Sequence, residues 1–110
     1  MKKRNAVTDP AQLNMLLATI HEKAVDSTNI AFSEHSIKRA IERDISLSEA
    51  VRVLQTGSFG QPVTAGNNEY RFQMAYIIAG RLIAVQAVCK IDRSGRVFVI
   101  TVFEMKGKRI

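Results

Sequence analysis

Three side chains that could bind an anion and transfer a proton recur every four residues along the chain, and they are His35, Arg39 and Arg43. Because an α-helix turns by about 100° per residue, this spacing places all three on one helix face, opposite Ile37 and Ile41. A guanidinium group can hold two oxygens of an anion, and an imidazole, which ordinarily has a pKa near ~6.5, can take up or release a proton at neutral pH. The spacing therefore predicts a cationic face for an anionic partner, although a solvated helix face would have the same pattern.

Each of these residues also has an ordinary structural role that would explain it. His35 lies in the first turn behind Ser33, so it could help to cap the helix and pack against the preceding loop. Arg39 and Arg43 could pair with Glu42, with Glu34 or with carboxylates on the strands, and each exposed ion pair would contribute only ~0.2–1 kcal/mol. The sequence by itself leaves both interpretations open.

The composition indicates one globular domain with a modest core, because the chain has 110 residues of which 46% are hydrophobic. Its one cysteine, Cys89, cannot form an intramolecular disulfide and lies in an apolar run, which indicates a buried thiol in a reducing compartment. One cysteine and two separated histidines cannot assemble a zinc site. No signal sequence or membrane-spanning run is recognisable. We therefore predict a cytoplasmic protein that uses no metal, no cofactor and no membrane.

The net charge of +6 has its origin at the two ends of the chain. The ten basic residues between these ends balance the ten acidic residues of the chain. Basic ends could contact the phosphates of RNA or DNA, or they could serve only to keep the protein soluble. The terminal basic residues are Lys2, Lys3, Arg4, Lys106, Lys108 and Arg109.

Helix signals occupy the first half of the chain and strand signals occupy the second half. The three predicted helices run from Asp9 to about 26, from Ser33 to about Asp44, and from Ser46 to the C-cap Gly57. The first and third helices are expected to begin with capping boxes, which Gln12 and Glu49 complete. Four runs of period two follow, at 58–65, 69–78, 81–91 and 96–104.

The last two runs are apolar on both faces, which is typical of central strands or of a subunit interface. Because no β-α-β pattern fits, the sheet is expected to be antiparallel. The predicted fold class is α+β, with three N-terminal helices followed by a four-stranded antiparallel sheet.

A family resemblance covers about two thirds of the chain, from Phe32 to Glu104. The order F-S-x-H-x-x-x-R-x-x-x-R, then I-S-L-x-E, a helix ending in glycine, and a closing strand resembles a bacterial family of domains of unknown function. That family is similar in predicted fold to the RelE-like ribonuclease toxins of the barnase, EndoU, colicin and RelE group. The resemblance implies an RNA-cleaving or RNA-binding ancestry. Asp44 departs from the pattern, because the family often has glycine there.

The resemblance divides the chain into three parts. Residues 1–28 would form a basic tip and an extra amphipathic helix, residues 29–104 a RelE-like α+β domain, and residues 105–110 a basic tail. The first helix lies outside the family motif, so it would serve packing or a partner.

Metal-independent RNA cleavage would give the candidate residues distinct roles. His35 would act as base or acid, and Arg39 and Arg43 would clamp phosphate oxygens. Thr101 would orient the substrate from the last strand, although a threonine among β-branched neighbours is also an ordinary strand former. Further cations on the sheet would bind substrate and a carboxylate would hold the imidazole; the candidates are Arg71, Arg81 and Lys90, and Glu42 or Glu104.

Two other function classes compete with a ribonuclease toxin. In the first, the domain is catalytically inactive and binds a protein through its first helix and its two-sided apolar strands. The partner would be an antitoxin, a component of a defence or counter-defence system, or a second copy, which makes a homo-oligomer an expectation. In the second, the domain binds a small anion, although the chain lacks a glycine-rich phosphate loop.

Overall fold

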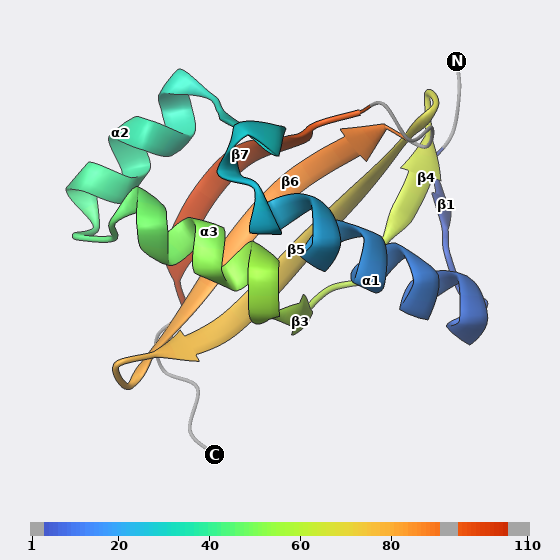
Figure 1. Ribbon diagram of the computed structural model, residues 1–110, viewed down its shortest axis with the longest axis horizontal. Helices are drawn as coiled ribbons and strands as arrows, with labels where there is room; N and C mark the ends of the chain where they lie inside the picture. The colour runs from blue at the N-terminus through green and yellow to red at the C-terminus, as the bar shows by residue number, and fades with distance from the viewer. Residues whose placement is uncertain (1–3, 91–94, 106–110) are drawn as a thin grey trace.

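The computed structural model describes residues 4–90 and 95–105, which form three α-helices and seven strands of one mixed sheet (Figure 1). The helices lie on one side of the sheet, and a 3-10 turn at Ser27–Asn29 follows the first of them. In chain order the elements are β1 (Asn5–Ala6), α1 (Pro10–Val25), β2 (Ile30–Phe32), α2 (Glu34–Glu42), α3 (Leu47–Thr56), β3 (Ser58–Phe59), β4 (Thr64–Gly66), β5 (Glu69–Ile78), β6 (Arg81–Lys90) and β7 (Val97–Glu104).

The sheet has the strand order β1-β4-β5-β6-β7-β2, and β3 pairs with β5 outside this path. β2 runs parallel to β7, and the other pairs are antiparallel. The predicted architecture of three helices before a four-stranded antiparallel sheet is therefore wrong, because β1 precedes α1 and β2 separates α1 from α2. Strands of two or three residues are too short to show an alternation of period two, so their distant partners define them.

The predicted strand run at 58–65 divides into β3 and β4 around Pro62. Proline has no backbone N–H to donate to a ladder, so a strand is interrupted at this position. The other three runs correspond to β5, β6 and β7 within one residue at each end. The segment between the predicted runs 81–91 and 96–104 lies largely outside the described residues, as do Lys2 and Lys3 and the tail at 106–110.

Side-chain caps begin all three helices, as the sequence predicts. Asp9 accepts a hydrogen bond from the backbone N–H of Ala11, and Ser33 accepts one from Ser36. The capping box of Ser46 and Glu49 is complete in both directions. In α1, by contrast, the side chain of Gln12 donates to the hydroxyl of Tyr70 at 3.3 Å instead of closing a capping box.

The hydrophobic core lies between the helices and one face of the sheet. Residues with helical spacing on α1 and α3 meet alternate residues of β5, β6 and β7, which is the arrangement expected for an amphipathic helix on a sheet. The fully buried members include Ile20, Ala24, Val53, Leu54, Met74, Ile83, Val85, Val99 and Val102. Within the described ranges 4–90 and 95–105, no helix has the length and apolarity needed to cross a bilayer.

Helix α2 packs through small residues. Its buried side chains are Ser36 and Ala40, whereas Ile37 is 38% exposed and Ile41 is 76% exposed. Small side chains let the helix backbone approach β7 closely, so neither the predicted cationic stripe nor the isoleucine pair opposite it is used for the core. Both faces of α2 therefore remain accessible.

The face of the sheet opposite the helices is called the open face here, because no helix of the described residues packs on it. The cross-strand register places its side chains in three rows, each with one residue from β5, one from β6 and one from β7. The first row is Arg71, Val88 and Phe98, and the second is Gln73, Gln86 and Thr101. The third row is Ala75, Ala84 and Phe103. The register shift between Gln86 and Ala87 adds Ile100 beside Thr101. The face is therefore mixed, with a polar row between two more apolar ones.

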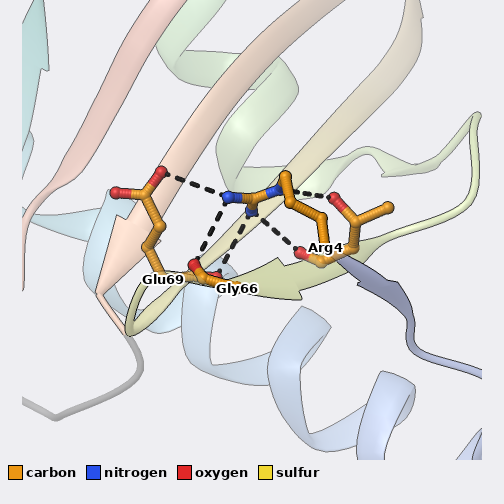
Figure 2. A network of polar contacts seen from close by, with 4 residues as sticks. Arg4, Gly66 and Glu69 are labelled. Carbon is orange, nitrogen blue, oxygen red and sulfur yellow. Dashed lines mark hydrogen bonds and ion pairs between the residues drawn. The ribbon is translucent and has the colours of Figure 1, made fainter. Parts of the chain in front are cut away.

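Arg4 belongs to the edge of the sheet, although the sequence suggests a basic tip there (Figure 2). Its guanidinium group donates to the hydroxyl and carbonyl of Thr64 and to the carbonyls of Gly66 and Glu69, at 3.0–3.4 Å. The Glu69 carboxylate lies 3.7 Å from Nη1 of Arg4. These contacts bridge both strands of the β4–β5 hairpin, so the side chain has a structural function in this edge.

The capping box gives a testable dependence of stability on pH. A hydrogen bond from the backbone N–H of Ser46 holds the pKa of Glu49 below its ordinary value. Because the pKa is lower in the folded chain than in the unfolded chain, the carboxylate stabilises the fold above the unfolded-state pKa of about 4.3, and this contribution is lost as the pH falls through the folded-state pKa. We expect Glu49→Gln to be less stable than the native chain at pH 7, with the difference shrinking by pH 3.

Urea unfolding at the two pH values measures this difference. Glu22→Gln is the matched control, because Glu22 is exposed on α1 and takes no part in a cap. A Glu49→Gln difference that persists unchanged at pH 3, or that Glu22→Gln reproduces, would contradict the assignment.

Candidate functional site

Helix α2 lies along the part of β7 that β2 leaves unpaired. β2 pairs with only the first three residues of β7, so carbonyl groups farther along this edge need other donors. The Ser33 hydroxyl donates to the carbonyl of Ile100 at 3.1 Å, and Nη1 of Arg43 donates to the carbonyl of Val102 at 3.0 Å. Both ends of α2 are therefore attached to β7, and these attachments fix which face of the helix is turned toward the strand.

A hollow of about 730 Å³ lies between this helix face and β7. The four residues that the sequence suggests for catalysis all line it: His35 and Arg39 from α2, Arg43 from its C-cap, and Thr101 from β7. Helical spacing alone predicts that the first three lie together, whereas Thr101 joins them because α2 is attached to β7. The remaining lining residues are Glu42, Asp44, Phe103 and Glu104.

Charges of both signs line the hollow, and its carboxylates outnumber its guanidinium groups by three to two. Two guanidinium groups, of Arg39 and Arg43, share the lining with the carboxylates of Glu42, Asp44 and Glu104. Nη1 of Arg39 lies 2.8 Å from Oε1 of Glu42, and both side chains are about half exposed, so the pair contributes only ~0.2–1 kcal/mol and can be exchanged for a ligand. Among the described residues Arg43 forms no ion pair, and its guanidinium is held by a carbonyl.

The imidazole of His35 is exposed at the hollow and has no hydrogen-bond partner among residues 4–90 and 95–105. The capping role that the sequence also allows belongs to Ser33, whose Oγ accepts the backbone N–H of Ser36 at 3.0 Å. His35 is thus placed to meet a ligand, and its ring is not needed to hold the helix.

Arg81 connects the strands and the end of α2 that border the hollow. Its Nε donates to Oε1 of Glu104 at 3.1 Å, and its two terminal nitrogens donate to the carbonyls of Asp44 and Arg43 at 2.9 and 3.0 Å. These bonds tie the start of β6 to the end of α2 and occupy every nitrogen of the guanidinium group. The arrangement gives Arg81 a positioning role, whereas the sequence suggests it as a substrate-binding residue.

The other two cations suggested for substrate binding lie away from the hollow. Arg71 is exposed on the open face and lines a second hollow, of about 500 Å³. Lys90 is exposed at the end of β6, where it is paired in register with Glu69. Because β6 separates β5 from β7, a ligand must cross the open face to contact both Arg71 and the hollow beside α2.

Sequence reasoning missed two lining residues, Phe103 and Asp44. Phe103 could have been found by period-two alternation from Thr101, since the two share a strand face. Asp44 has φ of 55°, in the left-handed region that favours glycine and that aspartate tolerates better than most residues. A glycine, which the motif of the resemblance implies at this position, would adopt the same backbone conformation without strain.

Within the described ranges, no group of three or more His, Cys, Asp and Glu side chains is arranged to hold a metal ion. At the hollow, the Glu42 carboxylate pairs with Arg39 and the Glu104 carboxylate pairs with Arg81.

Comparison with known protein families matches residues 32–104 to DUF4258, a domain of unknown function. The chain belongs to this family. The DUF4258 region contains α2, β7 and every residue that lines the hollow, and it excludes α1. No curated protein and no solved structure matches the chain. The family assignment carries no activity, so the relation to RelE-like ribonucleases stays a hypothesis.

Proposed function

We propose that this DUF4258 chain is an RNA-directed domain that cleaves single-stranded RNA, without a metal, at the hollow beside α2. The observation that supports the proposal best is that an exposed imidazole, two guanidinium groups and a hydroxyl, from His35, Arg39, Arg43 and Thr101, line one open hollow. These groups can supply a base for the attacking hydroxyl and positive charge for the transition state of phosphodiester cleavage by an internal hydroxyl. Released in a cell without control, such an activity would be toxic.

The proposed reaction proceeds by attack of the ribose 2′-oxygen on the adjacent phosphorus. His35 accepts the proton of the 2′-hydroxyl, the bond from phosphorus to the 5′-oxygen of the next nucleotide breaks, and that oxygen takes a proton from water. The hydroxide left behind takes the proton from His35, which returns the imidazole to its neutral form. The products are a 2′,3′-cyclic phosphate and a 5′-hydroxyl. Arg39 and Arg43 stabilise the extra negative charge on the phosphorus-bound oxygens during the attack.

Water supplies the leaving-group proton readily, because the hollow is open and its rim residues are exposed. The Glu42 carboxylate orients the Arg39 guanidinium and gives way to phosphate, since their exposed ion pair is weak. Thr101 supplies a hydroxyl donor from the facing strand.

The binding step is tested with 2′-O-methylated single-stranded RNA, which cannot be cleaved because the attacking hydroxyl is blocked. We expect Arg39→Ala to weaken binding roughly tenfold, the effect of losing about 1.4 kcal/mol, and to reduce the slope of log K against log salt by about 0.7, the value of one phosphate contact on a single strand. Fluorescence anisotropy in EDTA at several salt concentrations gives both quantities.

The matched control is Lys38→Ala. Lys38 is the next residue of the same helix and is exposed, but it does not line the hollow, so the variant loses the same charge outside the site. We expect its affinity to change less than twofold. If both variants lose affinity equally, RNA is attracted by general charge and the proposed site is wrong.

A protein-interaction module is the second candidate, and the exposed apolar pair on α2 favours it. Ile37 and Ile41 lie one helical turn apart, and neither contributes to the core. Such a pair is typical of a surface that binds an antitoxin-like partner or a second copy. A module of this kind would leave RNA intact in the assays that test the first candidate.

A further inference from the structure

The second hollow, of about 500 Å³, lies on the open face and contains the most buried polar side chain among the described residues of the sheet. Gln73 is only 5% exposed, and its Oε1 accepts a hydrogen bond of 3.0 Å from Nε2 of Gln86 on the neighbouring strand. Each carboxamide has a donor and an acceptor, so the bond persists when both amides are turned together and is lost when only one of them is turned. Gln73 therefore orients the exposed amide of Gln86.

The two hollows meet at the polar row of the open face. Gln73, Gln86 and Thr101 lie opposite one another on β5, β6 and β7. Gln73 and Gln86 line the second hollow, whereas Thr101 lines the hollow beside α2. Since neighbouring strands are about 4.8 Å apart, the row crosses roughly 10 Å of sheet. An extended ligand whose charged group lies at Thr101 would place its next segment over Gln86.

The surroundings of this row match the chemistry of a nucleotide base. Amide side chains can pair with the donor and acceptor edges of an unstacked base, and aromatic rings beside them provide a stacking surface. Phe98 is 42% exposed in the row next to Gln86, and Arg71 lies at the other end of that row and lines the hollow. Arg71 can bind a second phosphate along the same strand of RNA.

We propose that Gln86, oriented by Gln73, forms a base-recognition subsite for the nucleotide adjacent to the phosphate held beside α2. This inference rests on the proposed function, and it goes further by naming a sequence-discriminating contact. It also gives Arg71 a substrate-binding role at a distance from the hollow beside α2.

The test compares cleavage of four single-stranded RNA oligomers that differ only at the nucleotide next to the scissile phosphate. We expect the native chain to prefer one base over the least favoured by about tenfold in kcat/KM, the discrimination of one good contact of this kind. The Gln73→Leu/Gln86→Leu variant removes both partners of the amide bond, so no buried group is left unsatisfied. We expect it to cleave all four oligomers with rates within about twofold of one another.

The second variant is Gln86→Glu, which keeps the bond through a turned Gln73 amide but removes the donor at position 86. We expect Gln86→Glu to change which base is preferred. This test does not depend on whether the double variant folds. Cleavage with the native base preference in Gln86→Glu would overturn the subsite and leave the proposed function standing. A native chain that cleaves none of the four oligomers would overturn the proposed function itself, and the subsite with it.

Discussion

Replacing His35 by alanine is expected to lower the rate of RNA cleavage by about 10²–10⁴-fold, the range for losing one general acid–base group. The physical reason is that His35 offers the exposed imidazole among the groups that line the hollow beside α2. Binding of 2′-O-methylated RNA is expected to change little, because Arg39 and Arg43 remain to hold the phosphate. Gel analysis of a labelled single-stranded RNA in EDTA measures the rate, and anisotropy measures the binding.

Two observations separate a chemical role of His35 from a structural one. The side chain is exposed and Ser33 caps the helix, so the free energy of unfolding should change by less than ~0.5 kcal/mol. Added imidazole should restore part of the activity of His35→Ala, since it can take the vacated place. Lys38→Ala, which leaves the hollow intact, should cleave at the native rate. An unchanged cleavage rate in His35→Ala would remove the site from consideration.

The Gly57→Ala variant is expected to have the largest effect on stability, about 1–3 kcal/mol, as for an overpacked core position. A Cβ at Gly57 would lie 2.6 Å from the carbonyl oxygen of Val53 and 2.7 Å from that of Ala75, and both are backbone atoms that cannot turn aside. The Gly57 carbonyl also accepts a 2.7 Å hydrogen bond from His21, which links α1 to the end of α3. The midpoint temperature of thermal unfolding should fall by roughly 4–8 °C for each kcal/mol lost from the free energy of unfolding.

Gly60→Ala is the matched control for this prediction. A Cβ at Gly60 would meet its nearest atom, in the side chain of Gln73, at 3.5 Å, which is an ordinary contact. The variant should be near neutral, or slightly stabilised because alanine restricts the unfolded chain more than glycine does. Equal melting temperatures for Gly57→Ala and Gly60→Ala would show that the close approach of α3 to β5 is not a constraint.

At Gly57 the sequence predicts where the helix ends, whereas only the fold explains why the residue is glycine. The sequence predicts that Gly57 ends a helix, and it does. The usual reason for a C-cap glycine is a left-handed backbone, yet here φ is −75° and ψ is 179°, which any residue can adopt. Glycine is needed because a strand from another part of the chain passes too close for a side chain. Local patterns located the residue, and tertiary packing supplies the reason.

Several features of the candidate site could be predicted from local sequence. The four-residue spacing of His35, Arg39 and Arg43 determines a shared helix face, because helical geometry is set by near neighbours. The capping residues Ser33 and Ser46 locate the helix starts for the same reason. The predicted ends of the long strands β5, β6 and β7 agree with the structure to within one residue, since each strand is long enough to show the alternation of its side chains.

Other features depend on contacts between distant residues, and only the tertiary structure decided them. The strands β1 and β2 have too few residues to carry a pattern, and they exist through hydrogen bonds with β4 and β7. The hollow forms because the ends of α2 donate to β7 carbonyls that β2 leaves unpaired, which brings Thr101 and His35 to the same hollow. The roles of Arg4 and Arg81 were likewise invisible, because an arginine in a sequence does not reveal which carbonyl groups will surround it in the fold.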